Sequence, residues 1–401
     1  MSAVLPREAP VAGAAPPGGP LLHTYKRAPV EFVDGDGVYL IDADGRRYLD
    51  FVAGIAVNAL GYGDPGLRRA LRAAADGLVH VSNLYQSEPG ERLAGKLVAA
   101  SFASHVFFGN SGAEATEGAF KFARRWARRR GESKHEIIAL RGSFHGRLFA
   151  SLAATDRPAY RRPFRPLAPG IAICERDLDD LSAMADPETV AAIVIEPVQG
   201  EGGVRVFDAG FLAELRALAT ERGAALIFDE IQCGLGRTGT LFAYERSGVV
   251  PDILTLAKPL AGGLPMGAIL VNAGIAAAIE PGDHGSTFGG GPFVSTVASY
   301  VFDRVSDPAL LARVRDDGEW LGARLQRLAG ETDRVRAVRG VGYMWGIDTV
   351  RRASELVALA LDAGLLVCTA GDHTLRLLPP LVAARDALAS GVDILRDIIC
   401  S

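Results

Sequence analysis

The sequence has few cysteines and no long apolar run. Its four cysteines are scattered without CxxC spacing, at Cys174, Cys233, Cys368 and Cys400. This pattern shows neither a zinc site nor a disulfide framework and is typical of a reducing cytoplasm, where we expect the protein to work. No stretch approaches the roughly 20 apolar residues of a membrane span. Residues 1–24, rich in Ala, Pro and Gly, lack the apolar segment of a secretory signal and are expected to form a flexible leader.

An excess of charge of one sign is also missing. The chain has 43 Lys and Arg against 47 Asp and Glu, which gives a formal net charge of -4. It therefore has no global attraction for nucleic acid or for an anionic membrane. A basic run at residues 124–130 alternates with aromatic residues at helical spacing and favours a solvated helix face over a nucleic-acid site. We expect small-molecule partners, with no nucleic acid, no membrane and no metal.

The chain is long enough for two lobes around a cleft, because 401 residues exceed the usual size of one hydrophobic core. Between about residues 100 and 275, short apolar runs alternate with helical patterns, which predicts an α/β doubly wound sheet. Several of these runs are unbroken, as expected of strands that are covered on both faces. The expected strands are residues 105–108, 136–140, 170–174, 191–195, 224–228, 252–256 and 268–272.

The two ends of the chain predict a smaller lobe. Residues 30–50 alternate polar and apolar residues around the turn sequences DGDG and DADG, which indicates an antiparallel hairpin. After residue 307, a long helical pattern leads to two further apolar stretches, typical of a small α+β lobe. We expect residues 25–60 to join this small domain, residues 61–290 to form the large domain, and residues 291–401 to form the C-terminal small domain.

Three motifs carry candidate chemistry, and the first is NSGAEA at residues 110–115. It follows an expected strand and begins an expected helix, where free N–H groups and the positive end of the helix dipole favour an anion. Gly112 lets the backbone approach that anion closely. The motif therefore predicts a phosphate site, although Ser and Gly also cap helices generally, and plain capping stays open.

The second motif is the apolar strand that ends in Asp229, Glu230 and Gln232. A buried carboxylate needs a cationic partner, and a protonated pyridine nitrogen would serve. A pyridine ring that keeps this proton can accept the electrons left when a substrate carbon loses its own. A helix cap or a metal-binding Asp-Glu pair remains the alternative.

The third motif delivers one lysine, Lys258, from a buried strand into a Gly-rich loop. An ammonium is costly there, whereas a lysine bound as an imine loses that charge and is ready for exchange with an incoming amine. Alone, such a lysine could simply be solvated. Together, the three motifs place a phosphate site, an acid for a ring nitrogen and an imine lysine on one sheet, and Phe144 adds an aromatic ring suited to stacking on a flat cofactor.

The motifs NSGAEA, SFHGR, EPVQGEGG, FDEIQCGLGRTG, LAKPLAGGLPMGA, GDHGSTFGG and LRLLPPL occur in this order between about Arg27 and the C-terminus. With them, the chain resembles the class III pyridoxal-phosphate-dependent aminotransferases. The resemblance implies the aspartate aminotransferase-like fold, type I of the pyridoxal-phosphate-dependent transferases. It has a large domain with a mainly parallel seven-stranded sheet and a small α+β domain.

The resemblance also implies how pyridoxal 5'-phosphate is bound. Ser111, Gly112 and Ala113 would hold the phosphate, while Phe144 and Ile231 would pack on the two faces of the ring. Ala113 departs from the threonine that is common in the family, which removes a hydroxyl contact but not the backbone donors.

At the ring itself, the resemblance assigns the catalytic pair Asp229 and Lys258. Asp229 would pair with the ring nitrogen, and Gln232 would bond to the ring hydroxyl. Lys258 would bind the cofactor as an imine and later move a proton between carbons. Thr287 would reach the phosphate of the neighbouring subunit, which implies a homodimer or larger assembly with shared active sites.

Four positions are implied to bind substrate. Arg147 would bind the carboxylate far from the reacting amine, and Arg376 would bind the α-carboxylate of glutamate. Glu201 would cover Arg376 when the amine donor has no α-carboxylate near its amine, and Ser286 would lie near the substrate. For each arginine, a surface ion pair is the alternative.

The implied reaction transfers the terminal amine of Nα-acetylornithine to 2-oxoglutarate. It gives N-acetylglutamate 5-semialdehyde and glutamate, a reversible step of arginine biosynthesis. Ornithine, succinylornithine, succinyldiaminopimelate and carrier-linked lysine are alternative donors, and the departures Gly291 and Leu148 bear on this choice. An aminomutase of the same fold would need no keto-acid acceptor, and a non-enzymatic cofactor-binding regulator would be expected to lack Lys258 or Asp229.

Overall fold

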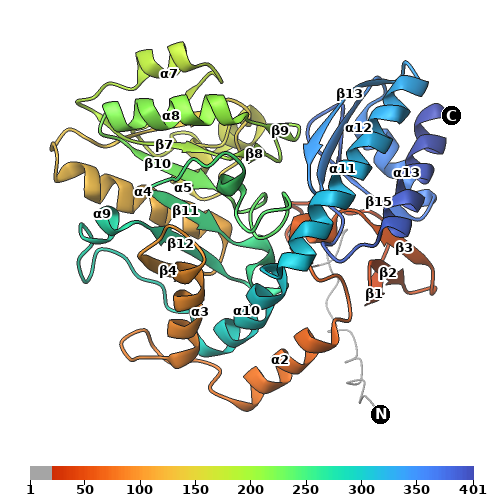
Figure 1. Cartoon of the computed structure of the whole chain (residues 1–401), viewed down its shortest axis with the longest axis horizontal. Coiled ribbons are helices and arrows are strands. Elements are labelled where there is room, and N and C mark those ends of the chain that lie inside the picture. The colour runs from red at the N-terminus through yellow and green to blue at the C-terminus, as the bar shows by residue number, and fades with distance from the viewer. Residues whose placement is uncertain (1–19) are drawn as a thin grey trace.

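The computed structural model describes residues 20–401, and they form two lobes (Figure 1). Most of the leader expected at residues 1–24 lies outside the described residues. The large lobe contains a seven-stranded sheet and occupies the left of Figure 1, and the small lobe lies on the right with the C-terminus. Among residues 20–401, no helix is long and apolar enough to cross a membrane.

The seven-stranded sheet confirms the expected α/β core. In spatial order its strands are β4 (His105–Gly109), β12 (Gly267–Val271), β11 (Ile253–Leu256), β10 (Ala225–Asp229), β7 (Val190–Ile195), β5 (Glu136–Leu140) and β6 (Ile171–Cys174). Only β12 runs against its neighbours β11 and β4, and the remaining pairs are parallel. The loops after the parallel strands therefore meet at one edge of the sheet, where ligands collect in such folds.

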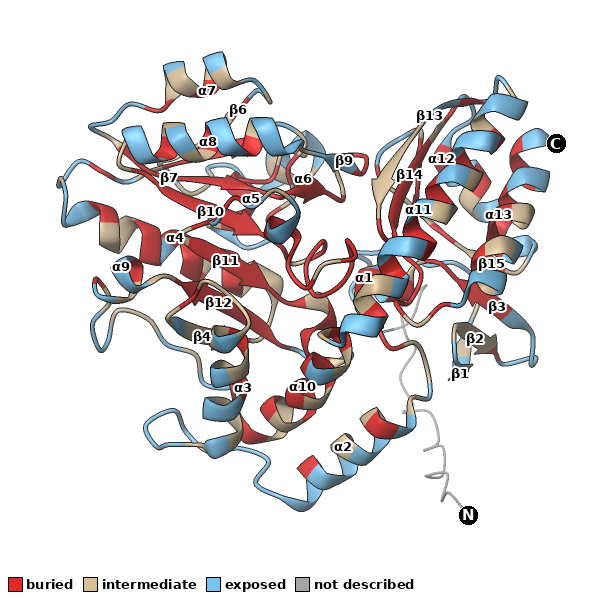
Figure 2. Cartoon of the chain, in the orientation of Figure 1, coloured by how far each residue is buried: buried red, intermediate tan, exposed pale blue. Residues whose placement is uncertain are grey.

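Helices cover both faces of this sheet, which explains why its strands are unbroken apolar runs (Figure 2). On β10, Ala225 and Ile227 pack with α4 (Gly112–Arg128) in one cluster. Leu226 and Phe228 point to the opposite face and pack in the cluster that contains residues of α8 (Ala209–Glu221). Side chains alternate between the two faces of a strand, so both sets had to be apolar.

Further helices and short strands complete the large lobe. They are α2 (Pro65–Asp76), α3 (Glu88–Ala99), α5 (Phe149–Ala153), α6 (Pro158–Arg161), η1 (Arg162–Phe164), α7 (Leu178–Met184), β8 (Val198–Gln199), β9 (Arg205–Val206), η2 (Ala243–Arg246), η3 (Lys258–Ala261), α9 (Ala273–Ala276) and α10 (Pro292–Val305). Because α10 packs on α2, α3 and η3, we propose that the large domain extends beyond residue 290, to the end of α10.

The small lobe contains elements from both ends of the chain. Its elements are β1 (Phe32–Asp36), β2 (Tyr39–Asp42), β3 (Arg47–Asp50), α1 (Ala53–Ala56), α11 (Pro308–Glu331), β13 (Val335–Val341), β14 (Met344–Thr349), α12 (Ala353–Asp362), β15 (Leu365–Leu366), β16 (Cys368–Thr369), β17 (Thr374–Leu377) and α13 (Arg385–Cys400). The expected hairpin is the antiparallel set β1, β2 and β3, and β3 pairs in parallel with β15. The second sheet has the order β13-β14-β17-β16.

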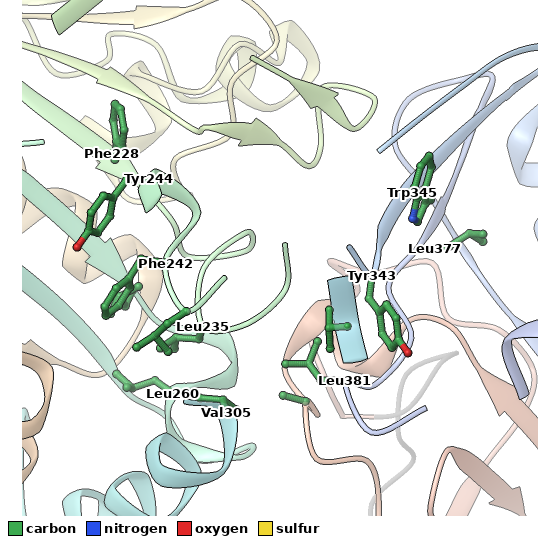
Figure 3. Packing of buried hydrophobic residues seen from close by; sticks show 14 of the residues in the cluster. Phe228, Leu235, Phe242, Tyr244, Leu260, Val305, Tyr343, Trp345, Leu377 and Leu381 are labelled. Carbon is green, nitrogen blue, oxygen red and sulfur yellow. The ribbon is translucent and has the colours of Figure 1, made fainter. Parts of the chain in front are cut away.

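One hydrophobic cluster continues from the large lobe into the small lobe (Figure 3). Leu235, Leu260 and Val305 come from the large lobe, and Tyr343 and Leu381 come from the small lobe. Close packing of this kind resists relative displacement of the elements that it joins. The cluster therefore fixes the position of β17 relative to the seven-stranded sheet.

Candidate active site

A cavity of about 410 Å³ lies at the edge of the sheet where the loops meet. This volume is in the range of small-molecule sites, roughly 300–1,000 Å³. The cavity brings together residues from the three motifs that carry candidate chemistry and from SFHGR and EPVQGEGG, whereas no residue of GDHGSTFGG or LRLLPPL lines it. The predicted residues that line it are Ser111, Gly112, Ala113, Phe144, Arg147, Glu201, Asp229, Ile231, Gln232 and Lys258.

The N-terminus of α4 forms one wall of the cavity. Ser111 caps the helix, and its side chain accepts a hydrogen bond of 3.2 Å from the Glu114 N–H. The N–H groups of the first turn have no intrahelical acceptor, and they carry the positive end of the helix dipole. A Cβ on Gly112 would lie 2.9 Å from the Ile231 side chain, so only glycine lets this helix approach the loop after β10 so closely.

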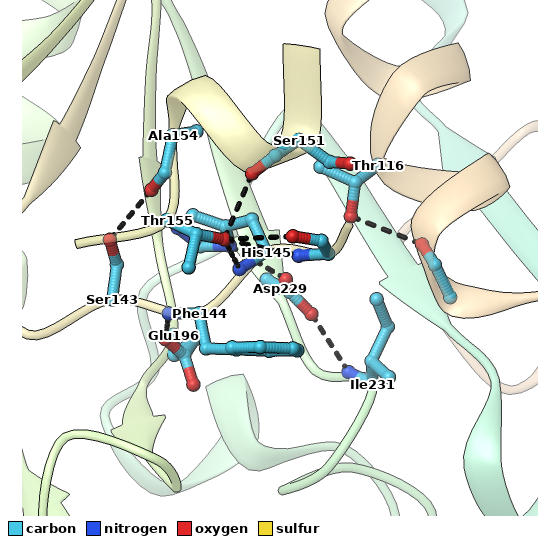
Figure 4. Close-up of polar contacts among 12 residues, drawn as sticks. Thr116, Ser143, Phe144, His145, Ser151, Ala154, Thr155, Glu196, Asp229 and Ile231 are labelled. Atoms are coloured by element: carbon cyan, nitrogen blue, oxygen red, sulfur yellow. Dashed lines mark hydrogen bonds and ion pairs between the residues drawn. The ribbon is translucent and has the colours of Figure 1, made fainter. Parts of the chain in front are cut away.

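Asp229 ends β10 and is buried, with 3% of its surface exposed. Its Oδ2 lies 2.7 Å from Nδ1 of His145, and its Oδ1 accepts a 3.1 Å hydrogen bond from the Ile231 N–H (Figure 4). Burial lowers the pKa of His145, but the hydrogen bond and the negative charge of Asp229 outweigh it, and the pKa is raised overall. Because both of its oxygens have a partner, the Asp229 carboxylate is held in one orientation beside the cavity.

The alternative of a metal-binding Asp-Glu pair does not fit this geometry. Glu230 turns away from Asp229 and accepts hydrogen bonds of 2.5 and 2.7 Å from the N–H groups of Ala243 and Tyr244. Burial raises the pKa of Glu230 to about 8. Within residues 20–401, no group of three or more His, Cys, Asp and Glu side chains is placed to hold a metal ion.

Glu196 also lines the cavity, next to the loop that carries Phe144. The sequence analysis did not select this residue. Its carboxylate accepts hydrogen bonds from the Phe144 N–H at 2.8 Å and from the Gly200 N–H at 3.2 Å. Burial raises its pKa to about 7, although the neighbouring His145 acts in the opposite direction. Glu196 thus ties the stacking aromatic to the loop that carries Glu201. Its place at the start of EPVQGEGG, directly after β7, is the signal that could have identified it.

Lys258 follows β11 and begins η3, and its side chain lines the cavity. Burial and the positive charge of Arg376 lower the pKa of its amine to about 8. More of this amine is neutral near pH 7 than in an exposed lysine, and only the neutral amine is a nucleophile. The position and the pKa both suit covalent attachment of a carbonyl compound.

The small lobe contributes Arg376 from β17, and this arginine is almost fully buried. One of its terminal nitrogens lies 2.6 Å from Oε1 of Glu201, and the other donates a 3.0 Å hydrogen bond to Oε1 of Gln232. Arg147 is exposed at the cavity, with its guanidinium carbon 3.8 Å from the centroid of the Tyr160 ring. Arg147 thus lines the cavity directly, whereas the buried Arg376 does not line it but contacts Glu201 and Gln232, which do.

Ser286 and Thr287 do not line this cavity. They lie in a separate hollow of about 1040 Å³ together with residues 80–91. Ser286 nevertheless reaches the start of α4, because its Oγ accepts a 3.1 Å hydrogen bond from the Asn110 amide. The hollow and the cavity therefore meet near the helix N-terminus.

The donor set of the cavity fits pyridoxal phosphate. It offers an anion site at a helix N-terminus, an oriented buried carboxylate, an aromatic ring on Phe144 and a lysine with a lowered pKa. Each of these matches one chemical feature of the cofactor: its phosphate, its ring nitrogen, its flat face and its aldehyde.

Comparison with known proteins identifies the family. Residues 23–399 match the family described as "Aminotransferase class-III". The chain belongs to the class III aminotransferases. It is therefore a pyridoxal-phosphate-dependent enzyme with the two-lobed fold described above, and the implied family is confirmed.

Three similar proteins illustrate the relationship. The mitochondrial acetylornithine aminotransferase of Alnus glutinosa is 46% identical over 94% of this chain and 85% of its own length. The crystal structure of N-acetylornithine aminotransferase from Stenotrophomonas maltophilia K279a has a TM-score of 0.82 and 37% identity, and covers 94% of this chain and 97% of that one. A structure of ornithine aminotransferase from Toxoplasma gondii, with partial occupancy of pyridoxal phosphate, has a TM-score of 0.90 and 29% identity, and covers 94% and 92%.

Proposed function

We propose that this class III aminotransferase transfers the terminal amine of Nα-acetylornithine to 2-oxoglutarate, giving N-acetylglutamate 5-semialdehyde and glutamate. The reaction is reversible and would serve arginine biosynthesis. The observation that carries the proposal is the ion pair beside the cavity between the buried Arg376 and the partly exposed Glu201. Relatives named acetylornithine aminotransferase, which are 41–46% identical over nearly the whole chain, support the choice of donor.

The first group of cavity residues holds the cofactor. Ser111, Gly112 and Ala113 bind the phosphate through the free N–H groups of the α4 N-terminus. Phe144 and Ile231 enclose the two ring faces. When bound, pyridoxal phosphate supplies an electron sink for the carbon that bears the reacting amine.

The remaining groups move and hold protons. Asp229, oriented by His145, keeps a proton on the ring nitrogen, and Gln232 bonds to the ring hydroxyl. Lys258 takes the proton from one carbon and returns it to another, a general acid–base role that suits a pKa of about 8.

The Arg376–Glu201 pair lets one cavity accept two kinds of substrate. For glutamate, Glu201 moves aside, and the guanidinium binds the α-carboxylate through two hydrogen bonds. For the amine donor, which has no carboxylate beside its reacting amine, Glu201 stays on Arg376 and neutralises it. Arg147 then binds the carboxylate at the far end of the donor, and Ser286 lies near the substrate.

Replacing Arg376 with alanine should damage the glutamate half-reaction more than the donor half-reaction. Losing a charged hydrogen bond of about 1.5–3 kcal/mol predicts a roughly 10- to 100-fold lower kcat/KM for glutamate. The donor should change much less, and Glu201→Gln should affect the donor instead, because it leaves Arg376 uncovered. Single-turnover rates with each substrate measure both effects. Equal losses in the two half-reactions of Arg376→Ala would refute the dual role.

The choice of donor is tested by a panel of amines with 2-oxoglutarate as acceptor. All four donors carry a carboxylate at the end far from the reacting amine, so Arg147 can bind each of them and does not rank them by itself. We expect kcat/KM to be highest for acetylornithine, ahead of succinylornithine, ornithine and γ-aminobutyrate, because the relatives that are 41–46% identical are named for this donor. The proposal is contradicted if unacetylated ornithine or γ-aminobutyrate is the preferred donor. Turnover without any keto acid would instead indicate an aminomutase.

We also propose that the enzyme works in the cytoplasm as a homodimer with shared active sites. Thr287 would then contact the phosphate bound by the partner subunit. The support is the large hollow around Ser286 and Thr287, which the exposed side chain of Leu84 lines, and the exposed Phe288 next to Thr287 in the chain. Leu84 and Phe288 are 87% and 65% exposed, which is unusual for large apolar side chains unless another surface covers them.

A further inference from the structure

A second cavity, of about 260 Å³, lies where the two lobes meet, behind the loop that carries Glu201. Arg157 and Arg205 reach it from the large lobe, and Arg336, Arg339 and His373 reach it from the small lobe. We call these five residues the arginine pocket. None of them belongs to the cofactor cavity.

The arginine pocket has an excess of positive charge. Asp348 is the carboxylate that lines it, and Arg339 already binds this group through two nitrogens at 2.6 and 2.8 Å. Within residues 20–401, Arg157, Arg205 and Arg336 have no ion-pair partner. Guanidinium groups that converge on a concave surface without a counter-charge attract anions.

Several donors of the arginine pocket are also unused. Arg205 donates from Nε to the Gly202 carbonyl at 3.2 Å, which leaves both of its terminal nitrogens available. Among the described residues, the Arg336 guanidinium makes no hydrogen bond. His373 is partly exposed at the rim, with Nδ1 3.3 Å from the Arg351 carbonyl. Donors from both lobes therefore face the same small volume.

We propose that the arginine pocket binds a compact oxyanion with two or more negative charges, such as a phosphate or a polycarboxylate. Two planar guanidinium groups from opposite lobes can each make paired hydrogen bonds to such an anion, whereas a single carboxylate would leave most of the charge uncompensated. The bound anion bridges the two lobes.

The arginine pocket is connected to the loop of Glu201. Arg157, Arg205 and Arg339 donate to three consecutive carbonyls, those of Glu201, Gly202 and Gly203. On the other side, Thr374 donates to Asp348 from the strand that also carries Arg376. Both members of the Arg376–Glu201 pair are thus attached to groups that line the pocket.

A bridging anion should therefore stabilise the arrangement in which Glu201 covers Arg376. This consequence rests on the proposed dual-substrate function, whereas anion binding itself does not. If the anion stabilises this arrangement, it should raise the KM for glutamate and leave the KM for the amine donor nearly unchanged.

Calorimetric titration of the holoenzyme with inorganic phosphate, and separately with citrate, at constant ionic strength tests the binding site. The informative variant is Arg336→Gln, because the Arg336 side chain is exposed and its loss should not disturb folding. Arg69→Gln, on the exposed side of α2, is the charge-matched control. Loss of one charged contact predicts that Arg336→Gln binds the anion at least roughly tenfold more weakly than the wild type, and that the control binds it with unchanged affinity.

Equal affinity in the wild type and Arg336→Gln would overturn the site, as would failure of both anions to bind the wild-type holoenzyme. Binding that depends on Arg336 without any change in the KM for glutamate would overturn the coupling to Glu201. The titration needs no turnover, so an error in the proposed substrate does not affect it. Phosphate and citrate affinities distinguish which oxyanion the pocket prefers.

Discussion

Replacing Lys258 with alanine is expected to abolish the visible absorbance of the covalently bound cofactor and to lower kcat by about 10⁴-fold or more. The amine lines the cavity with a pKa near 8, and we assign to it both the covalent bond and the transfer of the proton between carbons. Because the substitution removes both roles at once, the rate should fall by more than it would after loss of a general base alone. Absorbance spectra and steady-state rates with acetylornithine and 2-oxoglutarate measure the effect.

A second buried lysine provides the matched control. Lys134 donates hydrogen bonds to the carbonyls of Val190 and Arg222 and lines no part of the cofactor cavity. Lys134→Ala should lower the melting temperature but keep the cofactor absorbance and the rate per folded molecule. If Lys258→Ala kept its absorbance and turnover, the assignment of the lysine would be wrong.

The second large effect is expected for Asp229→Asn. An amide cannot stabilise the protonated ring nitrogen, and removing one partner of a buried ion pair costs about 3–5 kcal/mol. At about 1.4 kcal/mol per factor of ten, this predicts a loss of roughly 10²- to 4 × 10³-fold in kcat/KM for both half-reactions. Stopped-flow measurement of each half-reaction tests the prediction.

The adjacent Glu230 distinguishes a specific effect from a general one. Its pKa of about 8 means that the group is mostly neutral at pH 7, so Glu230→Gln keeps its size and its neutral state. The amide can accept only one of the two hydrogen bonds from Ala243 and Tyr244, so the melting temperature should fall. We expect this variant to keep both half-reactions within a few-fold of the wild type. Similar losses in Asp229→Asn and Glu230→Gln would show that the loop, and not the Asp229 carboxylate, determines the rate.

The strands of the large lobe could be predicted because burial on both faces makes them unbroken apolar runs. The expected strand at residues 136–140 coincides with β5. The strand expected at residues 224–228 is shifted by one residue, because Asp229 itself pairs with Thr255 in the parallel register. Local apolar patterns carry no information about such cross-strand pairing.

Contacts between distant segments could not be predicted in the same way. His145 and Glu196 lie in recognised motifs, yet their distant partners Asp229 and Phe144 are fixed only by packing of the loops at the sheet edge. The pairing of β3 with β15 joins residues more than 300 positions apart, and the sequence of neither strand indicates which strand it pairs with. The arginine pocket has the same character, since its members come from both lobes.

The central claim is that Lys258 and Asp229 contact opposite ends of one bound cofactor. A crystal structure of the holoenzyme tests it most directly. We predict that Nζ of Lys258 is bonded to the aldehyde carbon and that the Asp229 carboxylate lies within hydrogen-bonding distance of the ring nitrogen. A cofactor attached to another lysine, or a ring whose nitrogen faces away from Asp229, would contradict the account.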